Sequence, residues 1–337
     1  MPLPTYGFPA QPRHDLMRRL ISDLRERSDI ARQEAVTGRL VDPAGAHGGR
    51  ISELVGIDRA LANLTQYGEI LDLAESRATT IQNSLDSLRN LAVELHASGT
   101  TAIAANGGIA SATVSTAARQ ALTAAISALN VSFGGRGLFS GDAGGAAVVS
   151  AEAMFSASLV VLEAGPTAGA AYANLTVEFT LAGGLFDTGF YTGGTADAPA
   201  SEIAEDERIA FAPRADAAPV RALLRDLVAL AAAYDPDNAI PEDQRRGLAE
   251  NAVAGLRNVV DDLAAMSGRV GVAEERMATV RAHHNAAETA LTRAYNALAG
   301  RDQFEAAAEL TQLEAQLETT YLTTARLANL SLANFLR

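Results

Sequence analysis

The sequence predicts a mainly α-helical protein: an elongated rod of long antiparallel coiled-coil helices from both chain ends, with a small inserted α+β middle domain. Two long stretches carry this prediction, Leu54 to Leu95 and Met266 to Leu298. In both, apolar residues recur at alternating spacings of four and three, which averages about 3.5 residues per turn and is typical of a coiled-coil seam. The exceptions are Gly68, His284 and one slip of phase between Leu71 and Ala74. Because the two stretches are far apart in the sequence, the chain must fold back on itself to pair them.

The stretch from Met266 to Leu298 would form a helix roughly 50 Å long at a rise of about 1.5 Å per residue. A helix of that length needs a partner, and the earlier stretch provides one. An ordinary amphipathic helix of a globular all-α domain is the alternative, but the length and the strict period favour the coiled coil. The predicted rod core consists of Leu61, Leu64, Leu71, Ile81, Leu85, Leu88, Met277, Val280, Leu291 and Leu298.

At the N-terminus, residues 1–12 hold four of the eleven prolines and are expected to be extended or disordered. A helical pattern then runs from Arg13 to Gly38, and glycine is a common residue just beyond the end of a helix. The segment 41–50, rich in Pro and Gly, is predicted to be a loop that leads into the first rod helix.

That first rod helix is predicted to end at Ser98-Gly-Thr-Thr, and a second helix follows from Val114 to Phe133. The glycine-rich segment 134–145 lacks the Lys-Ser/Thr pair of a phosphate loop and does not follow a strand, so a flexible hinge is predicted. In the middle domain, Thr176–Leu181 alternates as a half-buried strand does, and Arg208–Ala212 is a second predicted strand. A helix is predicted from Val220 to Tyr234.

Helical pattern resumes near Pro241 and breaks at Gly300-Arg-Asp302, before a last amphipathic helix. The two terminal helices carry narrow apolar stripes, and a pair of such helices alone is marginally stable in water. We therefore expect them to pack against other molecules. The predicted assembly interface consists of Leu16, Leu20, Leu24, Leu310, Leu313, Leu317, Tyr321, Leu327, Leu330 and Phe335.

These patterns predict three domains. Residues 1–44 and 300–337 form an inner assembly domain of terminal helices. Residues 45–138 and 242–299 form the helical rod, and residues 139–241 form the inserted outer domain.

Composition excludes several classes of function. The net charge of −13 and the pI near 4.9 disfavour binding to nucleic acid or to anionic membranes. The chain has no cysteine, so it forms no disulfide and has no thiol nucleophile. The N-terminus lacks the pattern of a secretory signal peptide, and the longest apolar run is too short for membrane insertion.

No motif for catalysis, metal binding or cofactor binding stands out. His283 and His284 are adjacent, so they point to different sides of a helix, and a packed histidine is the favoured interpretation. The acidic group of Glu202, Glu205, Asp206 and Glu207 lacks the spacing and glycine of a calcium loop, and is interpreted as a solvated surface. The sequence predicts that the protein is not an enzyme and uses no cofactor.

Several motifs, in this order, resemble a known family. They are Gln33-Glu-Ala-Val-Thr-Gly38, Asp42-Pro-Ala-Gly, Leu88-Arg-Asn-Leu-Ala-Val-Glu-Leu95, Gly135-Arg-Gly-Leu-Phe-Ser-Gly141, Arg269-Val-Gly-Val-Ala-Glu-Glu-Arg276 and Ala325 to Leu336. Together they resemble bacterial flagellins, and more closely the flagellar hook-associated proteins at the junction between hook and filament. The resemblance covers both helical ends. The chain departs from the family at Val41-Asp42-Pro43, which keeps one acidic residue where the family usually has two.

The resemblance implies a rod built from both chain ends, with terminal helices that pack into a tubular inner wall. It implies export through the flagellar type III apparatus and a location outside the cell at the hook–filament junction of the bacterial flagellum. The implied partners are copies of the same chain in a ring or helical lattice, hook-associated protein 1, flagellin and an export chaperone. Two alternatives are a filament subunit, which is flagellin itself, and a coiled-coil sensory or adaptor module that dimerises through residues 266–298.

Overall fold

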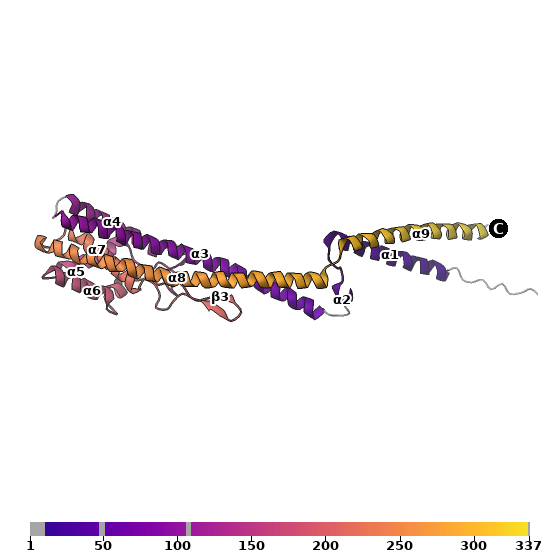
Figure 1. Cartoon of the computed structure of the whole chain (residues 1–337), viewed down its shortest axis with the longest axis horizontal. Coiled ribbons are helices and arrows are strands. Elements are labelled where there is room, and N and C mark those ends of the chain that lie inside the picture. The colour runs from indigo at the N-terminus through magenta and orange to yellow at the C-terminus, as the bar shows by residue number, and fades with distance from the viewer. Residues whose placement is uncertain (1–10, 47–50, 106–108, 336–337) are drawn as a thin grey trace, which may run out of the picture. The chain divides into compact units, whose positions relative to one another are not determined.

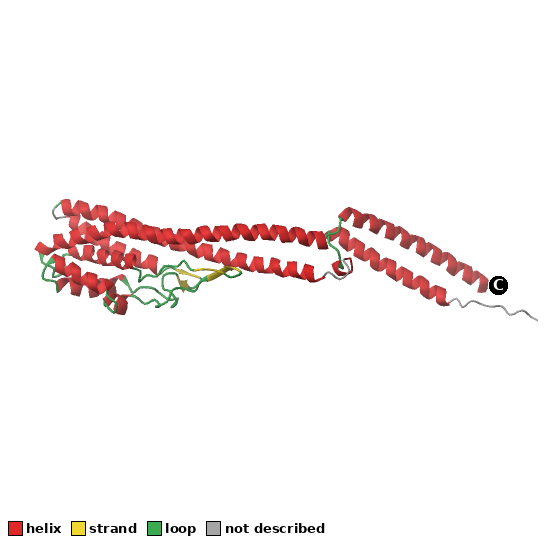
Figure 2. Ribbon diagram, turned by 60° about the horizontal axis from the view of Figure 1, so that its bottom comes forward, coloured by secondary structure: helices red, strands yellow, loops and turns green. Residues whose placement is uncertain are grey.

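The computed structural model describes residues 11–46, 51–105 and 109–335. It divides into two compact units. We call Met1–Thr65 with His284–Arg337 the terminal unit, and Gln66–His283 the central unit. Figure 1 labels the elements, and Figure 2 shows that helices dominate the described residues. The predicted mainly α-helical class is confirmed.

Most of the chain lies in long helices. They are α1 (Gln11–Thr37), α2 (Pro43–Ala46), α3 (Ile51–Ala104), α4 (Ile109–Leu129), α5 (Ala151–Glu163), α6 (Ala168–Thr180), α7 (Ala218–Ala233), α8 (Glu242–Ala299) and α9 (Gln303–Phe335), with a short π-helix at Phe186–Phe190. Within the described ranges, the strands form two small hairpins: β1 (Ser132–Phe133) pairs with β2 (Arg136–Gly137), and β3 (Ser201–Ala204) pairs with β4 (Glu207–Ile209).

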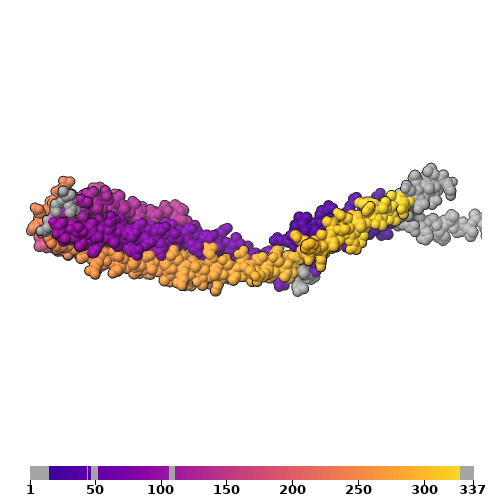
Figure 3. Space-filling view, turned by 45° about the horizontal axis from the view of Figure 1, so that its top comes forward, coloured from indigo at the N-terminus to yellow at the C-terminus, as the bar shows by residue number. Residues whose placement is uncertain are grey.

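In the central unit, α3 and α8 run antiparallel and side by side (Figure 3). The Gln82 side chain of α3 donates a 3.1 Å hydrogen bond to the Ser267 carbonyl of α8. Earlier on α3, Asp72 and Glu75 accept hydrogen bonds of 2.7 and 2.9 Å from Arg281, which lies later on α8. Residues earlier on α3 therefore contact residues later on α8, so the two helices are antiparallel, as the pairing of distant heptad stretches predicts.

The seam positions differ between the two units. Leu71, Ile81, Leu85, Leu88, Met277 and Val280, all in the central unit, are buried. Leu61, Leu64, Leu291 and Leu298, all in the terminal unit, are only half-buried, which differs from the prediction that they are core residues. The physical reason within the terminal unit is that its hydrophobic cluster of described residues lies between α1 and α9, around Leu24, Ala31 and Leu313, and does not include these four residues.

The predicted end of the first rod helix at Ser98 is wrong, because α3 continues to Ala104. The hydroxyls of Ser98, Thr100 and Thr101 donate to main-chain carbonyls four residues earlier, so these polar residues are satisfied within the helix. Gly99 is also used in packing, since a Cβ there would lie 2.5 Å from Cγ2 of Val253. The glycine allows α3 and α8 to approach closely instead of ending the helix.

The glycine-rich segment after α4 is a packed hairpin, which corrects the predicted hinge. Gly134 and Gly135 form the turn between β1 and β2 with φ of +59° and +77°. Two consecutive positive φ values suit the two-residue turn of a tight hairpin, and glycine adopts them without strain. Phe139 and Ser140, which follow, are fully buried and fix this segment in the core.

The predicted strand at Thr176–Leu181 is wrong, because this segment lies in α6. Its buried residues, Ala171, Leu175 and Phe179, recur every four positions and place one helical face in the core. Thr167 caps the start of the helix, because its hydroxyl accepts a 3.2 Å hydrogen bond from the Ala170 amide. Six residues of alternation were too short a signal to distinguish a strand from a helix.

The other predicted elements of the middle segment agree better with the structure. The predicted helix at Val220–Tyr234 is α7, and β4 overlaps the start of the predicted strand at Arg208–Ala212. Most of α7 is fully buried in the core that α3, α4 and α8 also form. The Ser115 hydroxyl of α4 donates a 2.7 Å hydrogen bond to the Ala231 carbonyl of α7. Residues 139–241 therefore share one continuous hydrophobic core with the helices around them.

Candidate assembly surface

In the terminal unit, α1 and α9 pack against each other along one narrow stripe. Leu24 and Ala31 of α1 and Leu313 of α9 are buried there, and Leu310 and Leu317 are partly buried beside them. These three buried residues contribute little buried apolar area compared with the core of the central unit. The pair therefore gains little stability from its own packing.

Polar contacts set the direction of this pair. Arg25 donates a 2.7 Å hydrogen bond to the Tyr321 hydroxyl, and its guanidinium lies 5.6 Å from the centre of that ring. Seven residues later, Arg32 donates a 3.2 Å hydrogen bond to Glu314. The partner position moves back along α9 as α1 advances, so the two helices are antiparallel. These groups are largely exposed, so they orient the helices more than they stabilise them.

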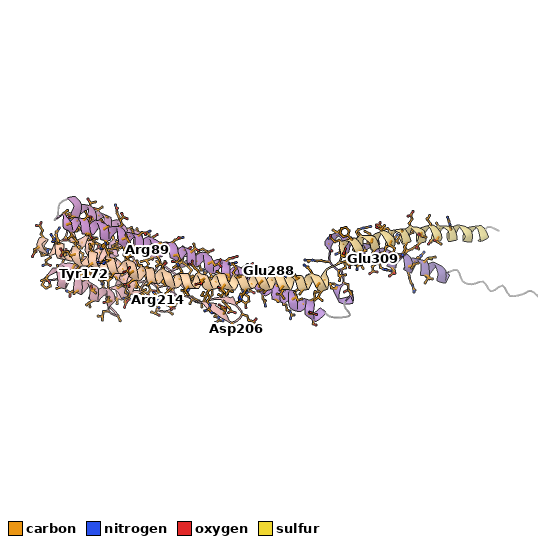
Figure 4. The ribbon with its side chains drawn as sticks, viewed as in Figure 1. Arg89, Tyr172, Asp206, Arg214, Glu288 and Glu309 are labelled. Carbon is orange, nitrogen blue, oxygen red and sulfur yellow. The ribbon has the colours of Figure 1, made fainter. Side chains whose placement is uncertain are left out.

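A compact corner of main-chain hydrogen bonds joins the two helices at their base. Gly38 ends α1 with φ of +65°, and its carbonyl accepts a 3.0 Å hydrogen bond from the Arg301 amide. Leu40 donates a 2.8 Å hydrogen bond to the Ala299 carbonyl. The Arg301 side chain donates a 2.8 Å hydrogen bond to Glu309, which is labelled in Figure 4. The predicted helix boundaries at Gly38 and at Gly300-Arg-Asp302 are confirmed.

The other face of α9 also carries large apolar side chains, and they have no cover within the described residues. Asp302 caps the helix by accepting a 2.8 Å hydrogen bond from the Phe304 amide. The Phe304 side chain is 88% exposed and that of Leu322 is 57% exposed. Both lie nine residues from the buried Leu313, in opposite directions, which is two and a half helical turns. They therefore share one face of α9, opposite the stripe that contacts α1.

The predicted interface residues fall into three groups. Leu24 and Leu313 are buried and Leu310 and Leu317 partly buried, all in the contact between α1 and α9. A second group is exposed to solvent: Leu16, Leu20 and Tyr321. The side chains of Leu327, Leu330 and Phe335 lie outside the described side chains.

Sequence reasoning missed Phe304 and Leu322 because neither lies on the seam. The spacing of residues along α9 could have indicated this second face. The residues between them on that face are Ala308, Thr311, Ala315 and Glu318, of which only Glu318 carries a charge. A helix with large apolar residues on two opposite faces is typical of one with neighbours on both sides.

Other kinds of site find no support in the described part of the chain. No group of three His, Asp or Glu side chains there could hold a metal ion. No helix there has both the length and the apolar character that crossing a bilayer requires.

No protein-family model matches the sequence, and neither does any curated protein sequence. Solved structures do resemble the chain. FlgL from Bacillus cereus matches with 16% identity and a TM-score of 0.53, over 72% of this chain and 99% of that one. A flagellar hook-associated protein from Vibrio parahaemolyticus matches with 12% identity and a TM-score of 0.51, over 72% of this chain and 94% of that one. The chain therefore has the fold of these proteins, which confirms the resemblance found in the sequence at the level of the fold.

Proposed function

We propose that this chain is a structural subunit of the bacterial flagellum, located at the junction between hook and filament. The observation that carries the proposal is the apolar outer face of α9, with Phe304 and Leu322 exposed on a helix pair that has almost no core of its own. Exposed apolar faces of this kind mark sites of protein–protein contact. The shared fold with flagellar hook-associated proteins supports a flagellar setting for that contact.

In this proposal, α1 and α9 pack with the same helices of neighbouring copies in a ring or helical lattice. Each copy covers the apolar surface that its neighbour exposes, so the terminal helices gain stability from assembly. Hook-associated protein 1 on one side and flagellin on the other are the proposed neighbours of the ring. The role is structural and requires no catalysis.

The proposed route to this position is export through the flagellar type III apparatus, with the help of an export chaperone. The protein then reaches its place outside the cell unfolded and folds there. The absence of cysteine is compatible with this route, since folding outside the cell then requires no disulfide chemistry.

Electron microscopy of bacteria that lack this chain tests the proposal. We expect complete hooks without filaments, and flagellin released into the medium. A filament subunit predicts a different result, with hooks that carry no filament and no flagellin in the medium. Normal flagella in the deletion strain would contradict both flagellar roles and would favour the coiled-coil adaptor.

A variant of the terminal unit makes the test specific to assembly. The double substitution Phe304→Ser and Leu322→Ser should leave the chain exported but absent from purified flagella. A matched control, Thr311→Ala on the same face, should assemble normally because it introduces neither charge nor bulk. Normal recovery of the double variant in flagella would contradict the proposed contact.

A further inference from the structure

A cavity of about 100 Å³ in the central unit has a basic character that its surroundings do not neutralise. Arg77 of α3 and Arg136 of β2 line it, with the aromatic rings of Phe133 and Phe211. Ser201 and Ile209, at the open end of the β3–β4 hairpin, complete one wall. The residues that line it include no Asp or Glu, although the chain as a whole carries a net charge of −13.

Neither guanidinium in this cavity is paired with a carboxylate. Arg77 is half-buried and forms no hydrogen bond or ion pair with any residue in the described ranges. Arg136 donates only to main-chain carbonyls, at 3.3 Å to Gly141 and 3.2 Å to Asp142. A guanidinium removed from bulk water favours a planar anion with two oxygens. The cavity therefore has the size and charge to accept a carboxylate on a short aliphatic stem.

The same hairpin carries unpaired carboxylates at its other end. Glu202 and Glu207 are paired, with Arg208 at 3.0 Å and with Arg276 at 2.7 Å. Glu205 and Asp206 form the turn, are exposed, and have no ion pair with any described residue. Figure 4 labels Asp206 at the projecting end of the hairpin. The acidic group noted in the sequence therefore divides into a paired half and a free half.

The acidic turn cannot fill the cavity of its own molecule. The strand from Ser201 to Ala204 separates the two by roughly 10 Å at about 3.4 Å per residue. The ion pair between Glu207 and Arg276 also holds the hairpin against α8. A chain that presents two complementary surfaces at separate places forms contacts that repeat from copy to copy.

We propose that the Glu205–Asp206 turn of a second copy inserts a carboxylate between Arg77 and Arg136 in this cavity. The contact is an acidic peptide turn in a basic pocket, and it adds a specific link between the central units of neighbouring copies. This inference rests on the proposed self-assembly in the flagellum. It concerns surfaces separate from α1 and α9.

Disulfide crosslinking in assembled flagella tests the contact directly. Because the chain has no cysteine, Asp206→Cys and Ala210→Cys variants each carry one thiol, and Ala210 is exposed at the cavity. Cells that produce both variants, with different tags, should yield a mixed disulfide dimer in the flagellar fraction after mild oxidation. The control replaces Asp206→Cys with Asp262→Cys, an exposed position on α8, and should yield no mixed dimer.

Charge reversal tests the chemistry of the same contact. Arg77→Glu should lower the recovery of the mixed dimer more than about tenfold, because it places like charges together. Combining Arg77→Glu in the Ala210→Cys chain with Glu205→Arg in the Asp206→Cys chain should restore it, which a merely misfolded variant would not do. Arg257→Glu, an exposed arginine on α8, is the matched control and should have no effect.

The outcomes separate this inference from the proposed function. If the variants enter the flagellar fraction but no mixed dimer forms, the inference is overturned and the proposed function stands. A crosslink from the Ala210→Cys variant to a different protein would also overturn it. If the wild-type chain is absent from flagella, the proposed function fails, and the inference fails with it.

Discussion

The Tyr172 hydroxyl of α6 donates a 2.7 Å hydrogen bond to Oδ1 of Asp226, a carboxylate of α7 that has no exposed surface. Arg225 donates two further hydrogen bonds to this carboxylate, at 2.7 and 3.0 Å. The Arg225 guanidinium also lies 4.9 Å from the centre of the Tyr172 ring. Burial raises the pKa of Asp226, and the hydrogen bonds from Arg225 oppose that rise. This buried group therefore joins α6 to α7 through contacts that depend on one another.

Removing the Asp226 carboxylate should lower the free energy of unfolding substantially. Asp226→Ala leaves Arg225, whose side chain is only 12% exposed, without its anion, and loss of one partner of a buried pair costs about 3–5 kcal/mol. Tyr172→Phe keeps the ion pair and should cost about 1–3 kcal/mol. Chemical denaturation of the purified variants gives both values. Asp262→Ala, on the exposed side of α8, is the control and should change the free energy of unfolding little. An unchanged stability of Asp226→Ala would mean that this pair does not exist in the protein.

Two glycines of α8 should respond with opposite sign to the same substitution. A Cβ at Gly255 would lie 2.2 Å from Oδ2 of Asp226 and 2.8 Å from the Tyr172 hydroxyl. Gly255→Ala should therefore lower the free energy of unfolding by about 1–3 kcal/mol through overpacking. At Gly268 a Cβ would meet nothing within 4 Å. Gly268→Ala should raise stability by up to about 1 kcal/mol, because alanine favours the helix. A melting temperature of Gly255→Ala that is equal to or higher than that of the wild type would contradict the packing at Gly255.

Stability should fall in alkaline solution. Burial is the main cause that raises the pKa of Tyr191 to about 12, and burial likewise places the pKa of Tyr172 above the usual range. In the unfolded chain both ionise near pH 10. A group whose pKa is raised on folding contributes stability that is present below its unfolded pKa. That contribution is therefore complete below about pH 10 and is lost as the pH rises toward 12.

Denaturation midpoints measured from pH 8 to 11.5 check this dependence. Tyr191→Phe should reduce the slope above pH 10, at the expense of the 2.9 Å hydrogen bond from Tyr191 to the Gly194 carbonyl. Tyr321→Phe is a suitable control, because its ring is exposed in the terminal unit. A wild-type midpoint that stays constant up to pH 11.5 would contradict the prediction.

The long helices could be predicted because their signal is global. The alternating spacing of four and three residues persists over many helical turns. The helix boundaries at Gly38 and Asp302 depend on capping by neighbouring residues, which can be recognised in the sequence. Short segments failed for the converse reason. Polar and apolar residues alternate in Thr176–Leu181 as in a strand. Phe179 is buried because it packs against Phe186 and Phe190, which lie later in the chain. Ser98 and Gly99 were predicted to end a helix because the contact with Val253 is invisible in sequence.

The candidate assembly surface was predicted only in part. The seam rule found Leu24 and Leu313, which are buried in the pair of α1 and α9. It could not find Phe304 and Leu322, because a seam rule assumes that each helix has one apolar face. Their role became apparent only when the structure showed which face of α9 the partner α1 occupies.

The two faces of α9 give a last prediction, which separates folding from assembly. Leu313 and Leu317 share the face toward α1, whereas Phe304 and Leu322 lie on the opposite face. Replacing Leu313 and Leu317 with Ser should weaken the α1–α9 pair in the monomer, by about 1.5–3 kcal/mol for a fully buried Leu. Replacing Phe304 and Leu322 with Ser should change the monomer by less than about 0.5 kcal/mol, as surface substitutions do. Both double variants should abolish swimming, but only the first should make α1 more sensitive to an arginine-specific protease.

Glu318→Gln completes this comparison, because the residue is exposed at the edge of the outer face and the substitution keeps its size. It should preserve both swimming and protease resistance. The central unit reports on general misfolding, since its own melting transition should be the same in all three variants. Normal swimming by the Phe304 and Leu322 double variant would show that the outer face of α9 takes no part in assembly. Greater protease sensitivity in that variant would instead show that the outer face stabilises the monomer, and the division between the two faces would then be wrong.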